Sequence, residues 1–379
     1  MSTTVTGPSP QTLLARLGRT REAAAAAGAD AVLITPGSDL RYVFGVGGDS
    51  FERLTCLVVP TSTDRPAVLV VPKIEAPHYA GADALGVELA AWVDGEDPYA
   101  LAAGAAGPTG SSARIAVSDF SPALHVLGLR AAMPGADQVL AGPIIRELRM
   151  RKDAAEVDEL RAAAAAIDRV HARVGEWLRP GRTEAEIGAD ITAAIVEEGH
   201  TEAAFVIVGS GPNGASPHHG VSDRVVEEGD VVVVDIGGPL PSGYCSDSTR
   251  TYAVGTPRDA DVTDTYAVLA AAQRAAVEAV RPGVAAEDVD TAARTVIADA
   301  GFGDHFIHRT GHGIGLDVHE EPYIVGGNTL ALEPGMAFSV EPGIYQPGRW
   351  GARIEDIVVV TETGVEALNR RPRGLEVIG

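Results

Sequence analysis

Residues 231–252 read VVVVDIGGPLPSGYCSDSTRTY. Apolar segments lie on both sides of a stretch rich in Gly and Pro, which is typical of two antiparallel strands joined by a turn. Each strand carries one aspartate, Asp235 or Asp247. The midpoint of these two positions, residue 241, falls within the turn. We therefore predict that the two carboxylates face each other on one side of the hairpin, with Cβ atoms about 5 Å apart.

The same arrangement recurs near the C-terminus. FSVEPGIY contains Glu341, ARIEDIVVV contains Glu355, and the midpoint of the two positions is Gly348 in QPGRWG. Like charges that face each other destabilise a sheet, and a free charge within an apolar strand is costly to bury. For one such pair, a surface ladder or a salt bridge is an equally good interpretation. Two pairs on apolar strands favour bound cations.

Histidines are concentrated in the same part of the chain, and six of the ten lie between positions 218 and 319. His312, in GHGIGLDVHE, has a glycine on each side, which lets other backbone approach closely. One neutral imidazole and four carboxylates form a hard, oxygen-rich donor set that suits Mn²⁺ or Co²⁺, with Zn²⁺ as an alternative. Four carboxylates balance two divalent ions. We therefore predict a pair of ions about 3.5–4 Å apart that share a hydroxide nucleophile.

The pattern along the chain predicts two domains. Residues 1–145 alternate short apolar runs with alanine-rich stretches, which is typical of an α/β domain. The expected strands there are 31–35, 55–59, 67–71 and 114–117, and the expected helices are 11–30, 75–83 and 97–106. Residues 150–379 group helices and strands in blocks, which indicates an α+β domain. The expected helices there are 153–178, 183–199, 260–280 and 285–300, and the expected strands are 203–209, 230–236, 243–254, 335–345 and 351–361.

The composition excludes several classes of partner. The chain has 379 residues, with 30 basic and 52 acidic side chains, so its formal net charge of −22 disfavours nucleic acid and anionic membranes. No apolar run reaches the roughly 18 residues of a membrane span. The first ten residues, MSTTVTGPSP, do not resemble a signal peptide. Cys56 and Cys245 are too few for a disulfide framework. We expect a soluble, cytoplasmic protein.

Five segments of the second domain together resemble the ligand segments of the pita-bread metallopeptidases. They are VVVDIGG, YCSDSTRTY, HRTGHGIGLDVHE, VEPGIY and RIED, in that order. This superfamily includes methionine aminopeptidase, aminopeptidase P, prolidase and creatinase. Methionine aminopeptidase lacks an additional N-terminal domain, so the chain is most similar to the aminopeptidase P and prolidase (Xaa-Pro peptidase) branch. The resemblance implies a pita-bread (creatinase/aminopeptidase) fold for residues 150–379 and a creatinase-like α/β domain for residues 1–145.

The resemblance also implies roles for individual residues around the metal ions. The implied metal ligands are Asp235, Asp247, His312, Glu341 and Glu355. Asp247 and Glu355 are the candidates for bridging carboxylates, and Glu341 also matches the family's general base. His319 matches the histidine that stabilises the tetrahedral intermediate. Arg353 is expected to hydrogen-bond to the ligands.

Three positions match residues that contact substrate. His218, in SGPNGASPHHG, matches the substrate-contacting histidine, and the adjacent His219 is the alternative in register. His308 resembles the histidine that lines the proline side of the cleft. Prolidases commonly carry an arginine four residues after the histidine equivalent to His319, where it holds the carboxylate of a dipeptide. This chain has Tyr323 there, which can form hydrogen bonds but has no charge.

The function implied by the resemblance is that of a dinuclear-metal exopeptidase acting on small peptides with proline at the second position. A metal-bridging hydroxide would attack the carbonyl between the N-terminal residue and proline. Because Tyr323 replaces the arginine that is common in prolidases, the sequence leaves two alternatives open, an Xaa-Pro aminopeptidase and an Xaa-Pro dipeptidase. Alternatives on the same fold are a metal-independent, creatinase-like C–N hydrolase, a non-catalytic binding protein, and a metal-dependent lyase or esterase. The family also implies a homodimer.

Overall fold

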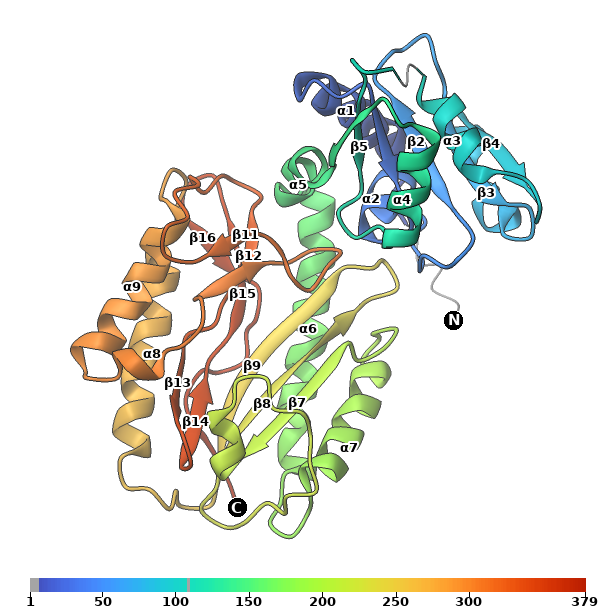
Figure 1. Ribbon diagram of the computed structural model, residues 1–379. Helices are drawn as coiled ribbons and strands as arrows, with labels where there is room; N and C mark the ends of the chain where they lie inside the picture. Colours follow the sequence, from blue (N-terminus) through green and yellow to red (C-terminus); the bar gives the residue numbers. More distant parts are fainter. Residues whose placement is uncertain (1–6, 108–109) are drawn as a thin grey trace. The chain divides into compact units, whose positions relative to one another are not determined.

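The computed structural model of this chain describes residues 7–107 and 110–379 (Figure 1). The chain forms two compact units, which divide between Arg149 and Met150. Both units mix helices and strands, in agreement with the predicted mixture. Within the described residues no helix has the length and apolar character needed to cross a membrane.

The N-terminal unit contains a six-stranded mixed sheet in the order β4-β3-β2-β1-β5-β6. The strands are β1 (Ala31–Ile34), β2 (Cys56–Pro60), β3 (Ala67–Pro72), β4 (Val87–Trp92), β5 (Arg114–Val117) and β6 (Asp137–Leu140). The helices are α1 (Pro10–Ala26), α2 (Ser38–Phe44), α3 (Pro98–Ala106), α4 (Ala123–Ala132) and α5 (Gly142–Met150). The central strands β1 and β2 are apolar and fully buried, which explains why they could be predicted correctly from the sequence.

One predicted helix of this unit is wrong. Residues 75–83 form two short 3₁₀ turns, Ala76–Tyr79 and Ala82–Leu85, and no α-helix. Pro77 removes a backbone donor and Gly81 lies between the two turns, so the helical hydrogen-bond pattern cannot continue.

The C-terminal unit begins with two helices whose start points the sequence predicted. α6 (Ala154–Trp177) begins at a capping box formed by Asp153 and Glu156, and α7 (Glu184–Glu197) begins at one formed by Thr183 and Glu186. Both helices pack on the sheet β17-β9-β8-β7. Its strands are β7 (Phe205–Ser210), β8 (Val231–Pro239), β9 (Cys245–Val254) and β17 (Glu376–Ile378).

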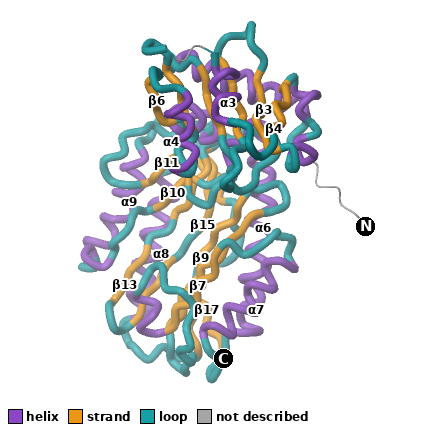
Figure 2. Tube along the Cα trace, turned by 45° about the vertical axis from the view of Figure 1, so that its right-hand side comes forward, coloured by secondary structure: helices purple, strands orange, loops and turns teal. Residues whose placement is uncertain are grey.

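The other half of this unit packs α8 (Val262–Ala279) and α9 (Ala286–Asp299) against the remaining strands. A five-stranded sheet has the order β11-β10-β12-β15-β16, and β13 pairs with β14. The strands are β10 (Gly311–Gly313), β11 (Glu320–Ile324), β12 (Ala337–Val340), β13 (Gly343–Gln346), β14 (Trp350–Arg353), β15 (Asp356–Val360) and β16 (Val365–Ala367). Within the unit, the strands lie between the helix pair α6–α7 and the helix pair α8–α9 (Figure 2).

The two long C-terminal strands of the prediction are each divided in the structure. Residues 335–345 form β12 and β13, and residues 351–361 form β14 and β15. The break in the first strand falls at Glu341 and Pro342, and Pro342 has no backbone donor for the ladder. The break in the second falls at Ile354 and Glu355. Both predicted glutamates therefore lie where the strands are interrupted.

Candidate metal centre

The C-terminal unit brings all five predicted metal ligands to one cavity of about 880 Å³. Asp235 comes from β8, Asp247 from β9 and His312 from β10, while Glu341 and Glu355 lie at the strand breaks. All five side chains line the cavity, and none of them is exposed to solvent by more than a small fraction. The elements that supply them are far apart in sequence, and the sheet pairings bring them together.

The predicted register of the first hairpin is wrong by two residues. Asp235 lies opposite Thr249, and Asp247 lies opposite Gly237. The tight turn at Leu240–Gly243, closed by a hydrogen bond from the Gly243 amide to the Leu240 carbonyl, sets this register. The two aspartates still share one face of the ribbon because the shift is even. As diagonal neighbours they are further apart than directly opposed residues, which leaves more room for a cation.

The register of the second pair agrees with the prediction. β13 pairs Gly343 with Arg353, and β12 pairs Val340 with Asp356. Both ladders have the alignment that sets Glu341 across from Glu355. Each glutamate also accepts one hydrogen bond from a neighbouring hydroxyl: Ser339 Oγ lies 3.1 Å from Glu341 Oε1, and Thr249 Oγ1 lies 2.8 Å from Glu355 Oε2.

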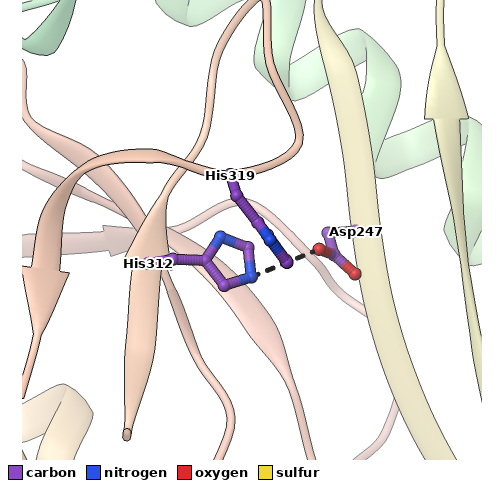
Figure 3. A group of neighbouring side chains, drawn as sticks. All are labelled: Asp247, His312 and His319. Carbon is purple, nitrogen blue, oxygen red and sulfur yellow. Dashed lines mark ion pairs between the residues drawn. The ribbon is translucent and has the colours of Figure 1, made fainter. Parts of the chain in front are cut away.

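His312 presents a free ring nitrogen to the carboxylates. Its Nδ1–H donates to the Gly313 carbonyl at 3.1 Å, and burial lowers the pKa of His312 to about 3. The neutral ring therefore keeps a lone pair on Nε2, which lies 3.2 Å from Glu341 Oε1. The same nitrogen lies 3.6 Å from Asp247 Oδ2, and Figure 3 shows these two side chains facing each other. This is the tautomer that a metal ligand needs.

The carboxylates have too few positive partners within the protein. Burial, followed by repulsion between neighbouring carboxylates, raises the pKa of Asp247 and Glu355 well above the ordinary values. Burial also raises the pKa of Glu341 to about 7. In addition, Asp235 Oδ1 and Glu355 Oε1 are buried and have no hydrogen-bond partner among the described residues. Oxygen atoms in this state fit direct coordination of a cation, so the residues present suit a metal centre.

Three overlapping groups of side chains could each hold a metal ion. They are Asp235 with Asp247 and Glu355, His312 with Glu341 and Glu355, and Asp247 with His312 and His319. In each group the potential ligand atoms lie within 4.8 Å of one another. Glu355 belongs to the first two groups and Asp247 to the first and third. The overlap is compatible with the expectation that these two carboxylates are shared between ions.

A hydrogen-bonded chain links the predicted metal ligands to the predicted proline side of the cavity. Arg353 Nη2 donates to Asp235 Oδ2 at 2.6 Å, as the sequence predicted, and Nη1 donates to the Tyr345 hydroxyl at 2.7 Å. The Tyr345 hydroxyl lies 2.8 Å from His308 Nε2. Because His308 Nδ1–H donates to the Arg309 carbonyl, its Nε2 accepts the Tyr345 proton. The sequence analysis did not assign Tyr345, although it lies within the quoted VEPGIY segment.

The structure distinguishes the two adjacent histidines, which both line the cavity. His219 Nε2 donates to the fully buried Glu184 at 2.8 Å. Glu184 also accepts hydrogen bonds from Ser210, Asn213 and Ser222, so it fixes the loop that carries both histidines. His218 has no such anchor among the described residues. Sequence reasoning missed Glu184 because it looked like an ordinary residue of a capped helix N-terminus.

Of the last two predicted site residues, one lines the cavity and the other does not. His319 lines the cavity, and its ring centroid lies 4.0 Å from that of His312 (Figure 3). Tyr323 lies on β11 opposite His312, but it is not among the residues that line the cavity. Its ring instead lies below the guanidinium of Arg309, 4.3 Å from Arg309 Cζ.

Comparison with known proteins agrees with this site. The profile of metallopeptidase family M24 matches residues 158–362, and the profile of the creatinase/prolidase N-terminal domain matches residues 16–151. A probable dipeptidase PepE of Mycobacterium tuberculosis is 58% identical over 365 residues, which cover 96% of each chain. An Xaa-Pro dipeptidase of Lactobacillus helveticus is 37% identical over 345 residues, covering 89% of this chain and 92% of the relative.

A solved structure shares the fold along almost the whole chain. The dipeptidase PepE of Mycobacterium ulcerans superposes with a TM-score of 0.93 at 57% identity, and the match covers 98% of this chain and all of the other. The family profile and these relatives, together with the buried carboxylates around His312, lead to one conclusion: this chain belongs to metallopeptidase family M24, the pita-bread metallopeptidases, and carries the creatinase/prolidase N-terminal domain.

Proposed function

We propose that this protein is a metal-dependent Xaa-Pro dipeptidase, which hydrolyses the bond between an N-terminal residue and a C-terminal proline. The observation that carries the proposal is the buried cluster of four carboxylates and a neutral His312, with two carboxylate oxygens that lack any partner among the described residues. Its relatives named Xaa-Pro dipeptidase support the substrate class, and the relatives named dipeptidase favour a dipeptide over a longer peptide. We assign catalysis to residues 150–379 and a supporting creatinase-like domain to residues 1–145.

The proposed metal ligands are Asp235, Asp247, His312, Glu341 and Glu355, with Asp247 and Glu355 shared between two ions. When bound, two divalent ions would polarise the scissile carbonyl and lower the pKa of an attacking water. The hard donor set favours Mn²⁺, with Co²⁺ or Zn²⁺ as alternatives.

Glu341 is positioned to handle the proton of the reaction. Its raised pKa of about 7 in the metal-free protein shows a carboxyl whose charge the surrounding protein does not stabilise fully. In the proposed reaction Glu341 takes a proton from the attacking water and gives it to the proline nitrogen as the C–N bond breaks. Ser339 holds Glu341 in place through its hydroxyl.

In the proposed reaction, His319 and His218 interact with the substrate. His319 donates a hydrogen bond to the oxygen that becomes negative as the carbonyl carbon turns tetrahedral. His218 binds the substrate, while His219 anchors the loop through Glu184. His308 lines the part of the cavity that receives the proline ring, and the buried Tyr345 holds it there through a hydrogen bond from its hydroxyl. The homodimer and the cytoplasmic location expected from the sequence stay predictions.

The test combines metal analysis with a panel of substrates. We expect about two divalent ions per chain after loading with Mn²⁺, and hydrolysis of Ala-Pro that stops on chelation and returns on Mn²⁺ addition. Ala-Pro-Ala and Ala-Ala should be poor substrates. Cleavage of Ala-Pro-Ala at the same rate as Ala-Pro would replace the dipeptidase with an aminopeptidase. Activity that survives complete chelation, or no hydrolysis of any peptide with bound Mn²⁺, would overturn the proposal in favour of a creatinase-like hydrolase or a binding protein.

A further inference from the structure

A second cluster of buried charges lies next to the metal centre but outside its cavity. Arg250 on β9 and Asp356 on β15 form an ion pair, with 2.7 Å between Arg250 Nη2 and Asp356 Oδ1, and both side chains are almost completely buried. Neither residue is among those that line the cavity. The two strands that carry the pair lie side by side in the C-terminal unit (Figure 1). Any effect of this pair on the reaction must therefore pass through its neighbours.

The guanidinium of Arg250 has an acceptor for each of its five N–H groups. Besides Asp356, the acceptors are four backbone carbonyls, each within 3.0 Å of a guanidinium nitrogen. They belong to Glu355, Thr249, Arg371 and Pro372. Arg250 is thus held by three separate segments, which are its own strand β9, the start of β15 and the C-terminal residues 371–372.

The carbonyl of Glu355 needs such a donor because this residue lies at a strand break. β14 ends at Arg353 and β15 begins at Asp356, so Glu355 belongs to neither ladder. Its amide donates to the Thr249 carbonyl at 3.1 Å, and its carbonyl accepts from Arg250 Nη1 at 2.6 Å. Two consecutive residues of β9 therefore hold the backbone of Glu355, in the place of a regular strand partner.

Asp356 is itself held by α8 and by the C-terminal segment. Its second oxygen, Oδ2, accepts from Gln273 Nε2 on α8 at 3.1 Å and from Arg373 Nε. In the same C-terminal segment, Asn369 Nδ2 donates to Asp168 on α6 at 3.1 Å. The cluster therefore connects both helix pairs of the unit to the residue that follows Glu355.

The charges of this cluster are balanced by the protein, unlike those of the metal ligands. Its one carboxylate, that of Asp356, has two cationic partners, Arg250 and Arg373. The cluster therefore needs no metal ion to stay together. It can keep the backbone of Glu355 in place before any ion binds, which reduces the ordering that metal binding requires.

We infer that Arg250 is a positioning residue, which holds the backbone of Glu355 so that its carboxylate can bind both ions. This inference rests on the proposed function, because it takes Glu355 as a ligand shared between two ions. Without the guanidinium, the Glu355 carbonyl loses its donor and the residue at the strand break becomes free to move. Ordering it again upon metal binding costs conformational entropy, which lowers the affinity for the metal.

The test measures the affinity of the chelated full-length protein for Mn²⁺, by titration at a temperature at which each variant is folded without metal. Arg250→Met should lower this affinity by about 10- to 100-fold, which is typical when a group that orients a metal ligand is lost. KM for Ala-Pro at saturating Mn²⁺ should stay within about twofold of the unaltered value, because Arg250 touches no substrate. Arg250→Lys keeps a cation beside Asp356 but has only three donors, so the affinity should fall less, by about threefold to tenfold.

Arg224→Met is the matched control for a merely structural role. Arg224 pairs with the buried Asp230 at 2.7 Å, and neither residue lines the cavity. Its loss should lower the thermal unfolding midpoint of the chelated protein but change the affinity for Mn²⁺ by less than about twofold. If Arg224→Met lowered the affinity as much as Arg250→Met, the loss of any buried ion pair would have this effect, and the inference would be overturned.

The inference is also overturned if Arg250→Met lowers only the unfolding midpoint and binds Mn²⁺ as tightly as the unaltered protein. If Arg250→Met does not fold, Arg250→Lys decides the question, and an unchanged affinity in that folded variant overturns the inference. Failure of the proposed function would look different, because the unaltered protein would then bind no Mn²⁺ or would not hydrolyse Ala-Pro.

Discussion

The two halves of the C-terminal unit are built from similar parts but hold their carboxylates in different ways. In the half with α6 and α7, Asp235 and Asp247 lie inside regular strands, and Arg353 from the other half neutralises Asp235. In the half with α8 and α9, Glu341 and Glu355 lie at strand breaks, and each accepts a hydrogen bond from a neutral hydroxyl, of Ser339 or Thr249. The difference indicates that the second pair depends more strongly on bound cations than Asp235 does.

Replacing one carboxylate from each half should give the largest contrast. Glu355→Gln alters the side chain that belongs to two of the three potential metal groups, so we expect loss of both ions and a fall in kcat of at least about 10³-fold. Asp235→Asn alters one group only, so one ion should remain. Elemental analysis of the purified variants together with kcat for Ala-Pro measures both effects.

Glu366→Gln, on β16 of the same sheet as β15, is the matched control, because Glu366 pairs with Arg161 away from the cavity. It should keep two ions and full activity. Equal loss of metal in Glu355→Gln and Asp235→Asn would remove the proposed asymmetry between the halves.

The metal-free protein should show the uncompensated charge of Glu341 as a dependence of stability on pH. The pKa of Glu341 rises from its ordinary value of 4.5 to about 7 in the folded protein. The folded state then binds more protons than the unfolded state between these values, so the free energy of unfolding should decrease as pH rises from about 4.5 to about 7, by roughly 3 kcal/mol. Urea unfolding of the chelated protein at pH 5 and pH 7.5 measures this change.

Bound Mn²⁺ should reverse this trend, because metal ligands must be deprotonated and the ions stabilise the folded state more at higher pH. In chelated Glu341→Gln the decrease should be smaller, because one titrating group is gone. A chelated protein that is more stable at pH 7.5 than at pH 5 would contradict the idea that these carboxylates lack positive partners.

Arg353 joins the two halves, so its removal should have an intermediate effect. Arg353→Met leaves Asp235 without its cationic partner and breaks the link to Tyr345. We expect metal affinity to fall by about 10- to 100-fold, as is usual when a hydrogen-bond partner of a ligand is lost. Titration of the chelated variant with Mn²⁺ measures the affinity. Arg353→Lys keeps the charge, so its affinity for Mn²⁺ should fall less. If Arg353→Met bound Mn²⁺ with the affinity of the unaltered protein, Asp235 would not need a cationic partner.

Sequence patterns identified the residues whose type is unusual for their surroundings, such as a carboxylate within an apolar strand. Carboxylates within apolar strands and a histidine between glycines indicated which side chains gather into a cluster that could hold metal ions, and two capping boxes predicted the starts of α6 and α7. The register of the first hairpin was not predictable in this way, because the turn at Leu240–Gly243 sets it and the aspartates do not. The strand β4 was not predicted, because its sequence is mixed and partly exposed and has no clear period.

Side-chain contacts between residues far apart in sequence could not be predicted from the sequence patterns either. Glu184 joins the loop at His219 across 35 positions, Tyr345 joins His308 across 37, and Arg309 stacks on Tyr323 across a strand. None of these residues has a neighbour in sequence that signals its partner. Each pairing follows from the packing of separate elements, which only the three-dimensional structure provides.

The smallest expected effect concerns His219, which anchors a loop of the first half. Glu184 keeps the donors of Ser210, Asn213 and Ser222 when His219 is replaced, so the loop should remain in place. We expect His219→Gln to change KM for Ala-Pro by no more than about twofold, whereas His218→Gln should raise KM about tenfold, since it removes a hydrogen bond to the substrate. Steady-state kinetics of the two variants decides the question. If His219→Gln had the larger effect on KM, the substrate contact would belong to His219, and Glu184 would position that residue for binding.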